Sequence, residues 1–139
     1  TPLELDDAPQ NQLVGAFLGS PAMNFLDVDV AEGGAEAVFA DGERIALPPA
    51  AVRPGKVLIG LRPESFVLGD GSDPASFGAE VVVVEPTGAD TELVMKKAGQ
   101  QFVATFRDRL SVSPGEKVHL KPVAGRAHLF DPATGARLA

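Results

Sequence analysis

From Met23 onward, hydrophobic positions follow the period of two that is typical of half-buried β-strands. Residues 25–30, Phe-Leu-Asp-Val-Asp-Val, alternate after their first step, as side chains do on the two faces of a strand. Further short apolar segments predict strands at 36–39, near 45, and at 57–61, 79–84, 92–96, 101–106, 117–120 and 128–130. This predicts an all-β fold, closed as a barrel or packed as two sheets, because closure removes strand edges.

Helix signals occur only near the start of the chain. Asn11 is a suitable N-cap for a helix over 12–18, and Gly19 supplies its end. We therefore expect a helical tail over 1–19 and a β-rich domain of two lobes over 20–139. The stretch 69–76, Gly-Asp-Gly-Ser-Asp-Pro-Ala-Ser, is the most linker-like part of that domain.

Two details of the strand pattern give sharper expectations. The run Val81–Val84 is continuously β-branched, which predicts a strand buried on both faces. The segment AVRPGKVLIGLRP (51–63) returns as SVSPGEKVHLKP (111–122). In both copies a type II turn with Gly55 or Gly115 at positive φ would lead into a strand that a proline ends. We expect one such unit in each lobe, although chance convergence of common turn residues remains open.

Composition and charge narrow the possible partners. The 139 residues are 45% hydrophobic, contain no cysteine and carry a net charge of −7, with −9 in residues 1–43 alone. An acidic chain repels phosphate backbones, and without Tyr or Trp it lacks a stacking groove for bases. No nucleic-acid partner is expected. We also expect no membrane insertion, because no apolar stretch reaches 18 residues. No signal peptide is visible, and the missing initiator Met indicates a fragment.

The chemistry-bearing residues predict no catalytic site. His119 and His128 lie in strand patterns without metal-ligand spacing. Neither a phosphate-binding glycine loop nor a nucleophile elbow is present. We therefore expect a chain that is not an enzyme and has no catalytic residue, metal site or cofactor site.

Three stretches are more specific than plain loops require. In residues 19–25, the end of the predicted helix, Pro21 and Asn24 come directly before a predicted strand. Residues 61–64 place Arg62 and Glu64 on either side of Pro63, and residues 84–92 form a turn that contains Glu85, Thr87 and Gly88. Taken together, these seven residues are our candidate interface or regulatory residues: Asn24, Arg62, Pro63, Glu64, Glu85, Thr87 and Gly88.

The same stretches, in this order, resemble a known family. The segments FLGSPAMNFL, GLRPE, VVEPTGADTEL and HLFDPATGARL are similar to the C-terminal regulatory region of MalK-type ATPase subunits of carbohydrate ABC importers. The initial segment resembles the helix that connects the ATPase domain to that region. The resemblance covers nearly the whole chain, from Thr1 to Leu138.

The resemblance implies a β-rich regulatory domain that contains an oligonucleotide/oligosaccharide-binding (OB) type barrel, often called a TOBE domain, built as two interlocked β subdomains. The implied partners are a second copy, the preceding ATPase domain, transmembrane permease subunits and regulatory proteins. The implied location is cytoplasmic, at the inner face of the membrane. ATP and magnesium would belong to the ATPase domain, whose motifs are absent from this sequence.

The resemblance also bears on the candidate residues. Arg62 and Glu64 match the family's Arg-Pro-Glu segment and would contact another subdomain or subunit, with an ion pair inside the domain as the alternative. Glu85, Thr87 and Gly88 match a second turn, where fold and partner binding remain equally open. Two other functions stay in view: a stand-alone domain that binds an oxyanion, which the acidic charge disfavours, and a sugar-binding OB module.

Overall fold

The computed structural model describes residues 22–47 and 54–138, and within these ranges it consists of strands and turns without a helix. The ten strands are β1 (Asn24–Val30), β2 (Glu36–Val38), β3 (Arg44–Ala46), β4 (Gly55–Leu61), β5 (Phe66–Leu68), β6 (Phe77–Thr87), β7 (Asp90–Lys97), β8 (Gln100–Phe106), β9 (Lys117–Pro122) and β10 (His128–Phe130). The predicted all-β fold is confirmed. The predicted helix over 12–18 lies outside the described residues.

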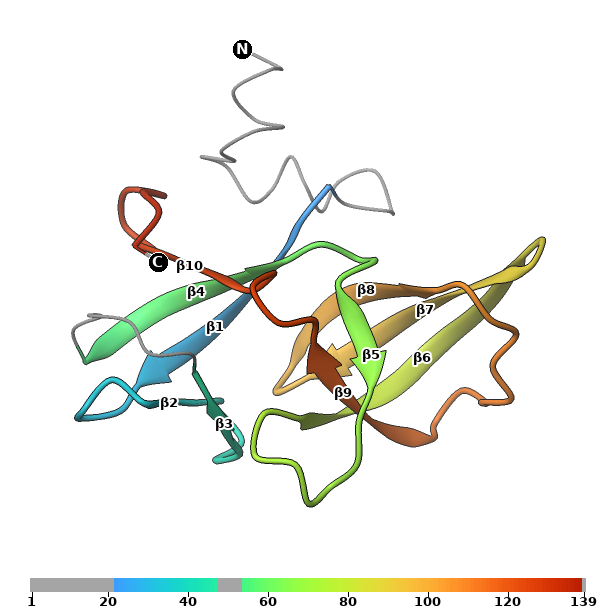
Figure 1. The fold of residues 1–139 in the computed structure, drawn as a ribbon, viewed down its shortest axis with the longest axis horizontal. Helices are drawn as coiled ribbons and strands as arrows, with labels where there is room; N and C mark the ends of the chain where they lie inside the picture. Colours follow the sequence, from blue (N-terminus) through green and yellow to red (C-terminus); the bar gives the residue numbers. More distant parts are fainter. Residues whose placement is uncertain (1–21, 48–53, 139) are drawn as a thin grey trace, which may run out of the picture.

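The strands form two five-stranded sheets that lie side by side (Figure 1). The first has the order β10-β4-β1-β2-β3, and the second has the order β5-β9-β6-β7-β8. All of their strand pairs are antiparallel.

The two sheets are interlocked along the chain. Strands β1 to β4 belong to the first sheet and β5 to β9 to the second, after which β10 returns to pair with β4. The chain therefore crosses between the sheets at 62–65 and again at 123–127, while 69–76 connects two strands of the second sheet. The predicted division into a tail and two lobes, with a linker at 69–76, stays a prediction.

The second sheet curls until its edge strands meet. Strand β5 contacts β8, and the amide of Thr105 in β8 donates a hydrogen bond of 2.7 Å to the carbonyl of Pro63, just before β5. Closure of this kind leaves fewer unpaired backbone groups at the sheet edges.

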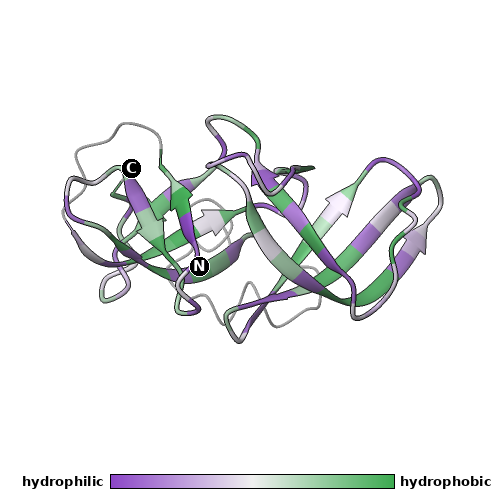
Figure 2. Cartoon of the chain, turned by 90° about the horizontal axis from the view of Figure 1, so that it is seen from below, coloured by the Kyte–Doolittle hydropathy of each residue, from purple (hydrophilic) through white to green (hydrophobic). Residues whose placement is uncertain are grey.

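One hydrophobic core is shared by both sheets. Leu26 and Ile59 of the first sheet pack in the same cluster as Leu93 and Met95 of the second. Phe77 is fully buried at its centre, with its ring centroid 5.2 Å from that of Phe39. Figure 2 shows the alternation of hydrophilic and hydrophobic residues along the strands that produces this inner face. Because the core is common, neither sheet buries its apolar face alone.

A smaller cluster covers the opposite face of the first sheet. It contains Met23, Leu58 and Phe130, with Phe25 packed against Phe130 edge to face at 5.5 Å. Gly60 makes this possible, because a Cβ at that position would lie 2.5 Å from the Phe130 ring and 2.7 Å from the Met23 sulfur. The glycine thus lets two large side chains lie directly on the backbone of β4.

Two strand expectations were wrong. The sequence pattern missed β5, whose three residues between Pro63 and Gly69 are too few to show a period. The run Val81–Val84 is not buried on both faces: Val81 is fully buried, but Val83 is 44% exposed. A β-bulge between Val81 and Val83 shifts the register there, and the outer face of this antiparallel sheet is open to solvent.

The repeated Pro-Gly segments lead into β4 in the first sheet and β9 in the second. Gly115 has φ +90° and the amide of Glu116 donates to the carbonyl of Ser113 at 3.0 Å, which fits the predicted type II turn. Gly55 has φ +127° and already pairs with Val30 at the start of β4. The residues that precede Pro54 in the first copy lie outside the described ranges.

We predict that Gly115→Val and Gly55→Val each lower the free energy of unfolding by about 1 kcal/mol or more, because a β-branched residue resists positive φ. Neither substitution creates a steric clash, since an added Cβ would meet no atom within 4 Å. Chemical denaturation measures the effect, with Lys117→Val on exposed β9 as the control. Unchanged stability of both glycine variants would contradict the prediction.

Candidate functional site: the seam between the sheets

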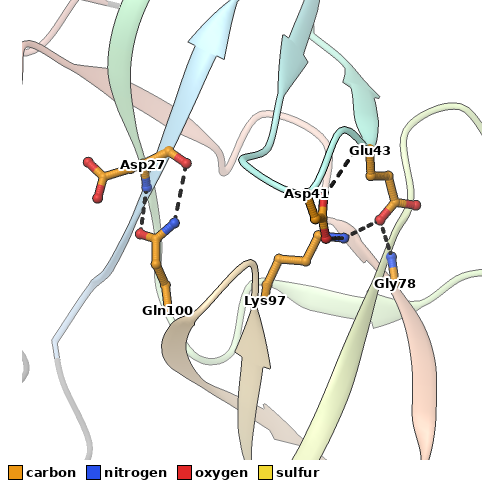
Figure 3. Close-up of polar contacts among 6 residues, drawn as sticks. All are labelled: Asp27, Asp41, Glu43, Gly78, Lys97 and Gln100. Carbon is orange, nitrogen blue, oxygen red and sulfur yellow. Dashed lines mark hydrogen bonds and ion pairs between the residues drawn. The ribbon is translucent and has the colours of Figure 1, made fainter.

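Two side-chain amides join β1 of the first sheet to β8 of the second. The Asn24 Nδ2 donates to the carbonyl of Val103 at 2.8 Å, and the Val103 amide donates to Asn24 Oδ1 at 2.9 Å. The Asp27 amide donates to Gln100 Oε1 at 2.8 Å, and Gln100 Nε2 donates to the Asp27 carbonyl at 3.3 Å (Figure 3). Each amide offers a donor and an acceptor, so it matches a peptide group of the facing strand.

These contacts keep a constant antiparallel register. Asn24 faces Val103, and three residues further along β1, Asp27 faces Gln100, three residues back along β8. In the half of β1 that contains Asn24 and Asp27, β4 lies on one side of the strand and β8 on the other. Strand β2 pairs with β1 only at Asp29 and Val30. The amides therefore satisfy backbone groups of β1 and β8 that no main-chain ladder reaches.

A buried lysine forms a second connection between the sheets. Lys97, at the end of β7, is 4% exposed, and its Nζ lies 2.8 Å from Asp41 Oδ2 and in contact with Glu43 Oε1. Glu43 Oε1 also accepts a hydrogen bond of 3.0 Å from the Gly78 amide of β6 (Figure 3). The ammonium lies 5.0 Å from the centroid of the Phe39 ring, a favourable cation–π position.

The ammonium controls the acidity of both carboxylates. Burial alone would raise the pKa of Asp41 and of Glu43, but the hydrogen bonds and charge of Lys97 outweigh it, so both pKa values lie below their usual 3.8 and 4.5. The Glu43 carboxylate is further favoured by the Gly78 amide. Both carboxylates are charged at neutral pH, and their ion pairs with Lys97 tie the turn between β2 and β3 to the second sheet.

Asn24 is the one predicted candidate residue in this seam. Its side chain is buried and bonded within the chain on both of its polar atoms. The sequence reasoning missed Lys97, although a signal existed: Lys97 continues the inward series of Thr91, Leu93 and Met95 at a period of two. A lysine in a buried register needs a partner of opposite charge.

The other candidates lie on two connecting segments. Arg62 is exposed, with Nη1 donating to the Ala22 carbonyl at 3.2 Å, and Glu64 is exposed beside it. Pro63 between them is buried. Glu85 and Thr87 are exposed in β6, and Gly88 is exposed in the following turn with φ +70°.

The structure places the two segments in one row across the second sheet. Glu85 pairs with Glu92 of β7, Glu92 pairs with Thr105 of β8, and Thr105 bonds to Pro63. Glu85 and Pro63 are thus three strand spacings apart, or roughly 14 Å.

A buried threonine, also missed from the sequence, fixes the segment beside this hairpin. Thr91 Oγ1 donates to the Asp108 carbonyl at 2.7 Å and accepts from the Leu110 amide at 3.1 Å. Arg109 Nε donates to the Gly88 carbonyl at 3.1 Å. The hairpin tip is therefore supported from one side, while Glu85 is exposed.

Comparison with known proteins defines the family. Residues 19–66 match the MalK OB fold domain, and residues 59–130 match the TOBE domain. The chain belongs to the TOBE domain family. The boundary between the matches falls at β4 and the first crossing segment, where the two sheets are joined.

The relatives of this TOBE domain are ATP-binding proteins of ABC transporters. An uncharacterised ABC transporter ATP-binding protein of Sinorhizobium fredii is 48% identical. The alignment covers 100% of this chain and 37% of that protein. The sn-glycerol-3-phosphate import ATP-binding protein UgpC of Ruegeria pomeroyi is 38% identical, over 100% of this chain and 38% of UgpC. The multiple sugar-binding transport ATP-binding protein MsmK of Streptococcus mutans is 34% identical, over 99% of this chain and 39% of MsmK. The chain thus spans less than two fifths of these relatives.

A solved structure supports the fold alone. The cytoplasmic molybdate-binding protein ModG, in its molybdate-bound form, superposes with a TM-score of 0.60 at 16% identity, over 78% of this chain and 96% of the ModG chain. Residues 22–47 and 54–138, which the structure describes, include no apolar helix of membrane-spanning length. The same residues contain no group of three His, Cys, Asp or Glu side chains that could hold a metal ion.

We predict that Asn24→Ala lowers the free energy of unfolding by about 2 kcal/mol or more, because it leaves the buried amide and carbonyl of Val103 without partners. Gln100→Ala serves as the matched control on the solvent-exposed end of the same seam, where water replaces the lost bonds at a cost of about 0.5 kcal/mol. Urea denaturation measures both. Equal losses in the two variants would show that the buried amide has no special role.

We also predict that Lys97→Met destabilises the TOBE domain by about 1–3 kcal/mol at neutral pH, below the value for a fully buried pair because its partners are partly exposed. Asp41 and Glu43 have lowered pKa values in the folded state, so their stabilising contribution is present above pH 4.5 and is lost as the pH falls through the lowered values. The difference between wild type and Lys97→Met should therefore narrow as the pH falls below the usual pKa values of 3.8 and 4.5.

Denaturation at several pH values tests this. Arg44→Met is the control, because Arg44 and its partner Glu36 are 57% and 48% exposed, and such surface pairs contribute little. A constant difference at all pH values would contradict the linkage to Asp41 and Glu43.

Proposed function

We propose that this chain is the non-catalytic regulatory and dimerisation part of the ATP-binding subunit of an ABC importer for sugars or related solutes. The observation that carries the proposal is the family match along nearly the whole described chain, combined with transporter relatives more than twice its length. In this proposal, ATP and magnesium are bound by the ATPase domain of the parent subunit. The permease subunits and a regulatory protein are the further partners.

The geometry of the exposed candidates supports a contact role. Arg62 and Glu64 flank a buried proline whose carbonyl is bonded to Thr105, so the two charges project from a fixed backbone. A two-fold interface brings one patch against its own copy, which a pair of opposite charges can satisfy reciprocally. Contacts of this kind set the register of an interface more than its affinity.

The proposed setting is cytoplasmic, at the inner face of the membrane through the permease subunits. The alternative, a stand-alone domain for an oxyanion or a sugar, has less support. The likeness to ModG is one of fold at 16% identity, and this chain is acidic, with a net charge of −7.

We predict weak self-association of the chain at roughly micromolar concentrations or above. Arg62→Glu or Glu64→Arg alone should weaken this association. The double exchange should restore it in part, because the exchanged charges can pair again across the two-fold axis. Sedimentation equilibrium measures the association. The matched control exchanges the exposed surface pair Glu36 and Arg44, 3.3 Å apart on the β2–β3 hairpin, and should leave association unchanged. A monomeric wild type at millimolar concentration, or no recovery in the double exchange, would exclude this patch as the dimer contact.

A further inference from the structure

A half-open pocket of about 320 Å³ lies between the two sheets. One wall is the inner face of the first sheet at Leu26, Ile59 and Leu61, and Phe77 of the second sheet contributes to the interior. The segment from Lys121 to Ala127, where the chain crosses back to the first sheet, forms the opposite side. Small-molecule sites in proteins start at about this size.

Small side chains account for the open space. Five of the lining residues have a methyl group or no side chain: Ala46, Ala75, Ala124, Gly125 and Ala127. Close-packed interiors leave few voids larger than a water molecule. Leucine or valine at some of these positions would have filled the pocket with core atoms.

Backbone hydrogen bonds anchor the walls of the pocket. The Ala46 amide donates to the Pro74 carbonyl, the Leu47 amide to the Ala35 carbonyl, and the Val123 amide to the Ser65 carbonyl, each at 2.8 Å. The end of β3 and the crossing segment are thus both tied to neighbouring backbone. These bonds fix the backbone positions of both walls.

The pocket is apolar except at one point. Lys121 is the single charged residue among those that line it, and its Nζ lies 2.9 Å from Asp73 Oδ2. The two side chains are 42% and 30% exposed. An exposed ion pair of this kind contributes little to stability, so the ammonium can exchange Asp73 for another anion at small cost.

We propose that this pocket binds a small anionic amphiphile, a free aliphatic or aromatic carboxylate whose apolar part enters between the sheets while its carboxylate pairs with Lys121. The volume is about twice that of an engineered 150 Å³ cavity that holds benzene, which suits a chain of about eight carbons or a substituted ring. The site lies within one chain. It goes beyond the regulatory and dimerisation role proposed above and does not depend on it.

The test uses the 139-residue chain with octanoate, its neutral analogue 1-octanol and the shorter butyrate as probes. We expect octanoate to bind with a dissociation constant of about a millimolar or below, to shift the amide NMR signals of the lining residues, and to bind more tightly than either other probe. Lys121→Gln should weaken octanoate binding about fivefold without changing 1-octanol binding. Asp73→Asn should strengthen octanoate binding, because it removes the competing carboxylate.

Matched variants separate the pocket from general effects. Ala127→Leu should fill the pocket and weaken both octanoate and 1-octanol, whereas Ala89→Leu at the exposed β6–β7 turn should change neither. Lys117→Gln, on the same strand but away from the lining, controls for loss of charge. Three outcomes would each overturn the proposal: no NMR shifts at the lining residues, equal effects of Lys121→Gln and Lys117→Gln on octanoate binding, or weaker octanoate binding in Asp73→Asn. These outcomes can be read even if Ala127→Leu fails to fold.

Discussion

The paired amide contacts between β1 and β8 are the constraint on which the arrangement of the two sheets depends. In its first half β1 pairs with β4 on one side. On the other side, the Gln100 side chain bonds to the Asp27 backbone, and the Asn24 side chain bonds to the Val103 backbone of β8, in place of a strand ladder. Asn and Gln side chains can do this because each carries one donor group and one acceptor in a plane, as a peptide does. A strand edge that would otherwise be free to pair with another chain is satisfied internally.

The other inter-sheet contacts follow from this alignment. With β1 held against β8, the hairpin of β2 and β3 reaches the end of β7, where Lys97 meets Asp41 and Glu43. The Lys97 side chain is buried, and contacts with two carboxylates and the Phe39 ring offset the cost of burying its charge. Its charge then favours ionised carboxylates in both partners. The seam combines neutral amides at one end with an ionic cluster at the other, and only the second responds to pH.

Sequence periodicity predicted most of the fold, because the alternation of inward and outward residues is a local property of each strand. Nine of the ten strands correspond to a predicted apolar segment, and the tenth, β5, has only three residues. The two exposed candidate segments, near Arg62 and near Glu85, were found from turn residues and from the resemblance. Their common row across the second sheet depends on strand order, which no local pattern contains. The same holds for Lys97, whose partners lie 54 and 56 positions earlier in the sequence.

The two crossing segments give the exposed candidates a structural context. The Val123 amide bonds to the Ser65 carbonyl at 2.8 Å, so the segment that leaves the first sheet and the segment that returns to it are joined. Arg62 and Glu64 lie at the first of these, and the apolar pocket lies beneath the second. The backbone next to Arg62 and Glu64 is therefore bonded to backbone that forms a wall of the pocket.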